Sequence, residues 1–167
     1  LNGAGKSTLG RALAERLGVH FIDNEDLYFP KTDPAYLYAA PRTREEAEAL
    51  LLREIEVHER FVFTSVKGDY GAEVVSSFRY AVLLEVPRDV RLQRVRDRSF
   101  QKFGNRMLPG GDLYEQEEGF LDFVASRGED TVEKWARTLR CPVIRVDGTR
   151  PVAENMEYIL ARIKIKT

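Results

Sequence analysis

The short motif Gly-Lys-Ser at residues 5–7, followed at once by an amphipathic segment, most constrains what this chain can fold into. It fills the last three positions of the phosphate-binding loop G-x-x-x-x-G-K-[ST]. In such a loop, glycines let backbone N–H groups turn toward phosphates, and the following helix presents its positive end to them. Leucines recur every fourth residue after the motif, which predicts a helix over residues 6–17 that ends at Gly18.

The loop pattern also indicates what should come before it. Its first glycine would lie one residue before Leu1, together with the strand that feeds such a loop. That strand is central to the sheet in folds of this type. We therefore expect the sequence to be truncated at its N-terminus, with the first strand of the sheet missing.

Continuous apolar runs alternate with helical segments along the rest of the chain. The runs predict strands over residues 19–22, 60–64, 80–86 and 142–146. The segments between them predict helices over residues 42–58, 88–98, 114–127, 131–139 and 152–164. Because the runs are continuous rather than alternating, they indicate a parallel sheet that is covered on both faces. We predict one α/β domain over residues 1–167, with three layers and a parallel sheet.

Composition excludes several classes of function. A net charge of −1 over 167 residues gives no overall field that would hold nucleic acid or an anionic membrane. No apolar run approaches the ~18 residues of a membrane span, so we expect a cytoplasmic protein. The single cysteine rules out an internal disulfide and argues against a Cys-rich zinc site. His20, His58 and Trp135 are interpreted as packing residues, because two histidines so far apart lack the spacing of a metal site.

The residues around the motif predict a site for ATP and Mg²⁺. Lys6 is expected to reach the β- and γ-phosphates and to be catalytic, and the hydroxyl of Ser7 is expected to ligate Mg²⁺, with Thr8 packed behind it. A glycine-rich turn that only caps a helix is the alternative. The predicted ATP-binding residues of this loop are Asn2, Gly3, Ala4, Gly5, Lys6, Ser7 and Thr8.

The phrase GKSTLGRALAERLG, followed by a strand that ends in F-x-D, resembles the shikimate- and gluconate-kinase branch of the nucleoside-monophosphate-kinase-like P-loop kinases. The resemblance implies a kinase-type P-loop NTPase fold with a lid, and transfer of phosphate from ATP to a small molecule. ABC-type transporter ATPases also show NGAGKSTL. They need an LSGGQ-like signature and an apolar run that ends in Asp-Glu, and this sequence has neither.

Three carboxylates, Asp23, Glu25 and Asp26, follow the apolar run at residues 19–22, whose carboxyl end should lie beside the loop. In the resembled kinases, one acid at this place helps to hold Mg²⁺ and another receives the substrate hydroxyl. The resemblance gives the first role, in metal binding and catalysis, to Asp23. It gives the second role to Glu25 or to Asp26. A solvated acidic turn is the alternative.

A basic segment over residues 88–106 stands where the resembled kinases carry an arginine-bearing lid. We expect the lid and an insertion over approximately residues 98–127. The resemblance implies that Arg98 and Arg106 supply positive charge to the transition state, while Arg94 lies against adenine. The alternatives are a solvated basic helix face and a nucleic-acid patch, which the overall charge disfavours.

The stretch SVKGDYG stands where shikimate-type enzymes have a glycine triplet beside the substrate, so the departure implies a different acceptor. Lys67, Gly68 and Asp69 are therefore assigned to acceptor binding, with Lys67 holding an anionic acceptor and Asp69 able to serve Mg²⁺. Arg42, in the stretch RTRE, matches an Arg-x-x-Glu that helps to grip acidic substrate in shikimate kinases. A surface turn is the alternative for SVKGDYG.

Near the C-terminus, Asp147, Gly148 and Thr149 resemble the loop that grips adenine through backbone contacts in these kinases. A strand-to-helix turn explains the same residues equally well.

The sequence thus predicts an ATP-dependent phosphotransferase that moves the γ-phosphate to a small-molecule hydroxyl or phosphate acceptor. A nucleotide kinase, whose acceptor is itself a phosphate, is a near alternative. A regulatory nucleotide-binding ATPase module with a protein partner is the alternative from another class.

Overall fold

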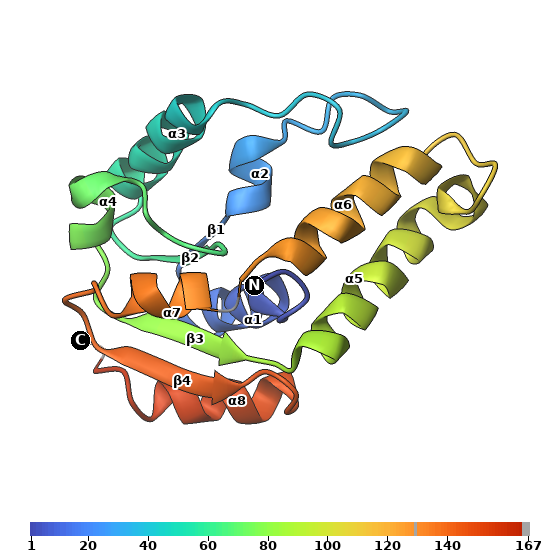
Figure 1. The fold of residues 1–167 in the computed structure, drawn as a ribbon. Helices are drawn as coiled ribbons and strands as arrows, with labels where there is room; N and C mark the ends of the chain where they lie inside the picture. Colours follow the sequence, from blue (N-terminus) through green and yellow to red (C-terminus); the bar gives the residue numbers. More distant parts are fainter. Residues whose placement is uncertain (129, 165–167) are drawn as a thin grey trace.

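The computed structural model describes residues 1–128 and 130–164 and has an α/β fold with parallel strands (Figure 1). The strands are β1 (His20–Asp23), β2 (Phe61–Thr64), β3 (Ala81–Glu85) and β4 (Val143–Asp147). The helices are α1 (Lys6–Leu17), α2 (Asn24–Tyr28), α3 (Arg44–Val57), α4 (Gly71–Ser76), α5 (Arg88–Phe103), α6 (Tyr114–Ser126), α7 (Asp130–Ala136) and α8 (Val152–Leu160), with the 3-10 helix η1 (Gly104–Met107) after α5. The predicted α/β class with parallel strands is confirmed.

The four strands form two parallel pairs. β1 pairs with β2, with Phe21 opposite Val62, and β3 pairs with β4, with Val82 opposite Ile144. Within the described ranges, β2 and β3 are not paired with each other. Parallel pairing places the carboxyl ends of paired strands at one edge, where ligands bind in α/β folds.

Helix α1 connects the two strand pairs. Its Leu9 and Leu13 are buried against Ile144 of β4 and Ile159 of α8, and Val62 of β2 packs against the same cluster. The leucine repeat that predicts this helix is therefore the face that enters the core. This packing fixes the N-terminal end of α1, which carries the phosphate-binding motif, relative to both pairs.

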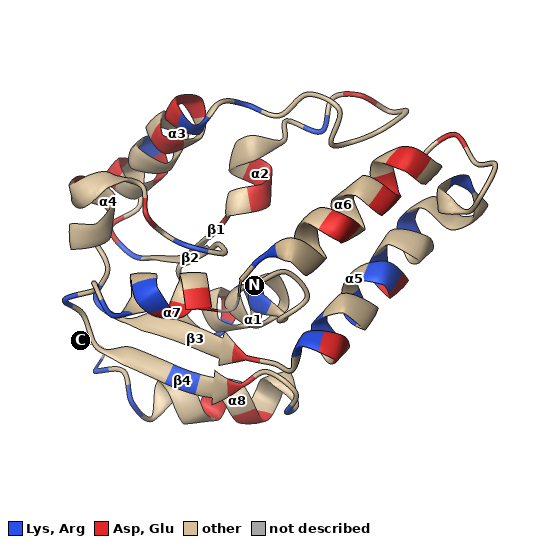
Figure 2. Ribbon diagram, viewed as in Figure 1, with Lys and Arg blue, Asp and Glu red and all other residues tan. Residues whose placement is uncertain are grey.

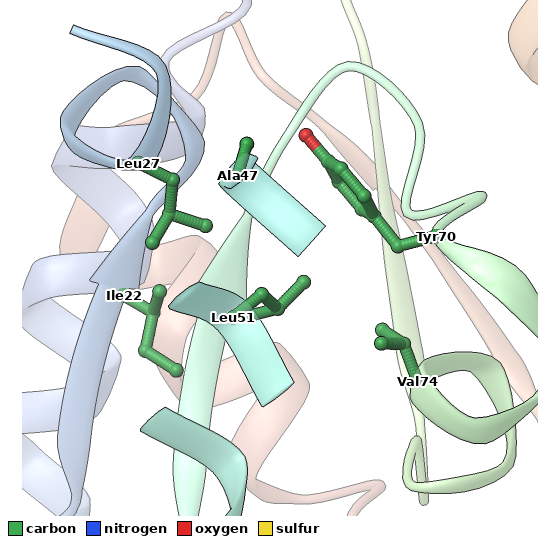
Figure 3. Packing of buried hydrophobic residues seen from close by; sticks show 6 residues of the cluster. All are labelled: Ile22, Leu27, Ala47, Leu51, Tyr70 and Val74. Atoms are coloured by element: carbon green, nitrogen blue, oxygen red, sulfur yellow. The ribbon is translucent and has the colours of Figure 1, made fainter. Parts of the chain in front are cut away.

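A second cluster holds α2 and α3 against β1 (Figure 3). Leu51 and Ala47 of α3 have no exposed surface, and they face Ile22 of β1 and Leu27 of α2. Burying a leucine side chain fully is worth about 1.5–3 kcal/mol. The buried residues of this cluster are Ile22, Leu27, Ala47, Leu51, Tyr70 and Val74.

The structure refines the predicted helix boundaries. The helix predicted from residue 42 begins at Arg44, because the Thr43 hydroxyl accepts from the Glu46 N–H while the Glu46 carboxylate accepts from the Thr43 N–H. This reciprocal pair is a capping box, which ends the non-helical backbone at Thr43. Helices α2 and α4 are not predicted from the sequence, because they are too short to show a helical period. The last helix ends at Leu160 rather than at residue 164.

Helices α5 and α6 form an antiparallel hairpin that projects from the strands (Figure 1). The hairpin has a small core of its own, in which Val95 of α5 packs with Leu121 and Val124 of α6 and with Met107 of η1. Figure 2 shows that Lys and Arg mark α5, whereas α6 carries Asp and Glu. The hairpin contains most of the segment for which a lid is predicted.

Candidate functional site

A cleft of about 970 Å³ opens between the loop before α1, the carboxyl ends of β1 and β2, and the α5–α6 hairpin. This volume is at the upper end of the range for small-molecule sites. It therefore has room for a nucleotide and a second small ligand. The predicted site residues that line it are Asn2, Gly3, Gly5, Lys6, Ser7, Thr8, Asp23, Glu25, Lys67, Asp69, Arg94 and Arg98.

The loop before α1 has the backbone geometry of a phosphate cradle. Gly3 and Gly5 have φ angles of +78° and +90°, a region that glycine adopts without strain. A Cβ on Gly3 would lie 2.2 Å from the carbonyl oxygen of Arg91, so α5 packs directly on this loop. Ala4 is buried behind the loop, and Lys6 donates to the carbonyl of Leu1 at 2.9 Å.

Positive charge gathers around Lys6. Burial lowers the pKa of Lys6 to about 8; Asp23 opposes this shift, while Arg98, Arg127 and Arg91 add to it. Several cations held near one another lower each other's proton affinity, and they favour a ligand with several negative charges. The electrostatics of this part of the cleft suit a polyphosphate.

The carboxylates at the end of β1 and directly after it have different environments. Asp23 accepts from the Glu25 N–H at 3.1 Å and so caps α2. Glu25 lines the cleft, and its carboxylate is 3.2 Å from the ammonium of Lys31. Asp26 lies outside the cleft lining and pairs with Lys31 at 2.6 Å. Glu25 therefore faces the cleft and Asp26 does not, whereas the sequence does not distinguish between them.

A chain of hydrogen bonds links the hairpin to Glu25. The Tyr38 hydroxyl donates to the Glu25 carboxylate at 3.1 Å and accepts from the ammonium of Lys102 on α5. All three residues line the cleft. The sequence gives no signal for this chain of hydrogen bonds, because the contact between Tyr38 and Lys102 joins residues that are 64 positions apart.

The SVKGDYG stretch contributes a charged pair to the cleft. Lys67 and Asp69 lie 2.8 Å apart. Although partial burial opposes it, this pairing holds the pKa of Asp69 below its ordinary value. Arg44 donates to the Asp69 carbonyl. Gly68 is buried and does not line the cleft; a Cβ at this position would lie 3.0 Å from the ring of Phe78.

Two predicted arginines lie outside the cleft lining. Arg42 donates to the carbonyl of Leu27 at 2.8 Å and thereby supports the end of α2. In the same RTRE stretch, Arg44 lines the cleft instead. Arg106 binds the carboxylate of Asp112 at 2.6 Å at the far end of the hairpin. Each of the two outlying guanidiniums thus has a protein partner away from the cleft.

The Asp147–Thr149 loop lies behind the phosphate loop and outside the cleft lining. The Asp147 carboxylate accepts from the N–H and the hydroxyl of Thr149, at 2.9 and 2.6 Å, and so closes the turn. Arg94 donates to the carbonyl of Gly148 at 3.1 Å and lies 3.5 Å from that of Gly3. Arg94 therefore connects the two loops at the inner wall of the cleft.

Arg127 is a site residue that sequence reasoning missed. It follows α6, lines the cleft and donates to the Asn2 side chain at 3.0 Å. Its guanidinium lies 4.5 Å from the centre of the Phe123 ring, and burial lowers its pKa. The sequence shows Arg127 only as a single cation at the end of a helix that carries several acidic residues, which is an ordinary C-terminal position for a cation.

The two histidines, which the sequence presents as packing residues far apart along the chain, pack against each other in the fold. His20 and His58 stack with their ring centres 3.7 Å apart. Glu54 lies beside both, and the ligand atoms of these three residues are within 4.8 Å of one another. The pairing of β1 with β2 and the packing of α3 bring together residues that are 38 positions apart.

Comparison with known proteins identifies a family and solved structures that this chain resembles. The profile of a family described as AAA domain matches residues 1–106. YqaC of Bacillus subtilis (strain 168), described as an uncharacterized protein, is 30% identical over 95% of this chain and 91% of its own length. A gluconokinase from Sinorhizobium meliloti 1021 superposes with a TM-score of 0.51, at 20% identity over 96% of this chain and 86% of that one. An uncharacterized protein from Eubacterium ventriosum ATCC 27560 gives 0.46, at 14% identity over 96% and 92%.

The likeness to the gluconokinase concerns the fold, which is a kinase-like P-loop fold. Among the described residues, no helix combines the length and hydropathy needed to cross a membrane.

Proposed function

Because the chain belongs to the AAA domain family and has a kinase-like P-loop fold, we propose that it transfers the γ-phosphate of ATP to a small-molecule hydroxyl or phosphate acceptor. The observation that carries this proposal is the composition of one cleft. It joins a phosphate loop with Lys6, a carboxylate side with Asp23 and Glu25, and an arginine-bearing hairpin. A reaction that consumes ATP would take place in the cytoplasm.

The phosphate side would be formed by α1 and its loop. Backbone N–H groups and Lys6 would hold the β- and γ-phosphates, and the Ser7 hydroxyl and Asp23 carboxylate are oxygen donors of the kind that Mg²⁺ prefers. Mg²⁺, when bound, would neutralise charge on the β- and γ-phosphates. Asn2 and Thr8 would complete the loop's contacts with the nucleotide.

Arg98 and Arg127 would supply the remaining positive charge. Both line the cleft and both influence the pKa of Lys6, so they lie within electrostatic range of the same phosphates. Charge that is already in place before the reaction stabilises the transition state without reorganisation. Arg106 would have to leave Asp112 to join them. We place adenine beside Arg94, with Asp147, Gly148 and Thr149 supporting that wall.

The acceptor would bind on the opposite side, between Glu25 and the Lys67–Asp69 pair. Glu25 would orient the acceptor hydroxyl, because its carboxylate faces the cleft and is fixed by Tyr38. Lys67 and Arg44 would attract an acceptor that carries negative charge. Positioning of this kind supplies most of the catalysis in phosphoryl transfer, because the protein itself forms no bond.

The proposal is tested by a transfer screen. The protein is incubated with Mg-ATP and panels of sugars, hydroxy acids, nucleosides and nucleotides, and phosphorylated products are identified by mass spectrometry. We expect one panel to give a product, and we expect Lys6→Ala to abolish it while leaving the far-ultraviolet circular dichroism unchanged. Hydrolysis at background rate with every panel would favour a regulatory ATPase module instead.

A further inference from the structure

The sequence contains two histidines, and both lie at one place in the fold. His20 begins β1, and His58 follows the last residue of α3. Glu54 stands one helical turn before His58. Its carboxylate lies 2.7 Å from Nε2 of His20 and 3.8 Å from Nε2 of His58. These three residues do not belong to the nucleotide cleft, since none of them lines it.

The two distances from the Glu54 carboxylate are close to the spacing of ligand atoms around a tetrahedral metal ion. Zn²⁺ binds histidine nitrogen and carboxylate oxygen at about 2.0–2.2 Å, so two ligand atoms of a tetrahedral site lie roughly 3.3 Å apart. The observed separations of 2.7 and 3.8 Å lie on either side of this value. A shift of about half an ångström in each would meet it.

The side chains have room to make that adjustment. The rings of His20 and His58 are now stacked, with 14° between their planes, so one ring must turn for both nitrogens to face a common ion. The side chains of His20, Glu54 and His58 are 36%, 41% and 37% exposed, respectively. This exposure lets a ring rotate and leaves a water molecule access to the fourth position.

We propose that His20, Glu54 and His58 bind a divalent first-row transition-metal ion, with Zn²⁺ as the best fit and water as its fourth ligand. Two imidazoles and a carboxylate select Zn²⁺, Co²⁺ or Ni²⁺ over Mg²⁺, which prefers oxygen ligands alone. The site is separate from the cleft, because Asp23 lies at the other end of β1, about 10 Å along the strand. Bound metal would tie the end of α3 to the start of β1.

The test uses Co²⁺ and Zn²⁺ with the whole protein in the absence of nucleotide. Tetrahedral Co²⁺ has strong visible absorption, so the titration reports both stoichiometry and geometry. We expect one ion per chain, and Zn²⁺ should displace the Co²⁺ band. At about 100 times its dissociation constant, Zn²⁺ should raise the unfolding midpoint by roughly 5–10 °C.

Four variants decide the result. His58→Gln, His20→Gln and Glu54→Gln should each weaken Zn²⁺ binding at least tenfold in calorimetry. Glu56→Gln is the matched control, because it removes an exposed carboxylate from the same helix without touching the cluster. Circular dichroism checks folding, and if His20→Gln does not fold, the other two substitutions decide. Absence of a Co²⁺ band, or equal loss of binding in Glu56→Gln, would overturn the proposal.

Discussion

The packing of α5 on the phosphate loop makes Gly3→Ala an informative substitution. An alanine at φ +78° costs about 1–2 kcal/mol in backbone strain. Its Cβ would lie 2.2 Å from the Arg91 carbonyl oxygen, well inside the ~3.3 Å of a normal C···O approach. Forcing a methyl group into packed structure costs a further 1–3 kcal/mol or so. We therefore expect Gly3→Ala to lower the free energy of unfolding by about 2–5 kcal/mol.

Gly18→Ala separates the two contributions. Gly18 also has a positive φ, of +62°, but no atom lies within 4 Å of the Cβ position. This control should show the backbone strain alone, so the difference between the variants isolates the contact with Arg91. That difference should be about 1–3 kcal/mol, or roughly 2–12 °C in unfolding midpoint for a chain of this size. Urea unfolding measures it, and equal losses in the two variants would refute the close approach of the loop to α5.

Three further predictions concern the cleft. The pKa of Lys6 is about 8 in the free protein, and nucleotide phosphates should raise it, so ATP binding at about pH 8.5 should take up part of a proton. Calorimetry in buffers of different ionisation enthalpy detects this uptake, and it should vanish near pH 6, where Lys6 is already protonated. Arg98→Ala should lower kcat by about 10²-fold and more than Arg106→Ala does, whereas equal losses would show that the hairpin brings both arginines to the phosphates. Glu25→Gln should lower kcat by about 10²-fold, and Asp26→Asn by much less; the reverse order would exchange their roles.

The parts of the fold that sequence predicts are those whose signals are local. The Gly-Lys-Ser motif and the leucine repeat of α1 lie within 17 residues, and the continuous apolar runs fall on the strands β1 to β4. Both signals depend only on which side chains enter the core. The first residue of α3 is less well determined, because apolar periodicity does not reveal the Thr43 cap that sets where the helix begins.

The sequence predicts only those parts of the site whose residues lie together in one segment of the chain. The carboxylates after β1 follow from their place at a strand end, yet the choice between Glu25 and Asp26 depends on Lys31 and Tyr38, which belong to the next loop. Arg127 enters the cleft because α6 returns along α5. No residue spacing in the sequence predicts that α6 runs back along α5. Nor does any spacing predict that the two histidines come into contact.

The separate hydrophobic core of the α5–α6 hairpin affects how the hairpin can move. Because Val95, Leu121 and Val124 pack with one another rather than with the strands, a rotation of the hairpin as a rigid body would leave this core intact. Its restraints toward the rest of the chain include polar contacts, such as those of Arg127 with Asn2 and of Lys102 with Tyr38. A ligand that accepts hydrogen bonds from Arg127 and Lys102 more strongly than Asn2 and Tyr38 do would thus change the angle between the hairpin and the strands. The backbone would rotate only at the two ends of the hairpin.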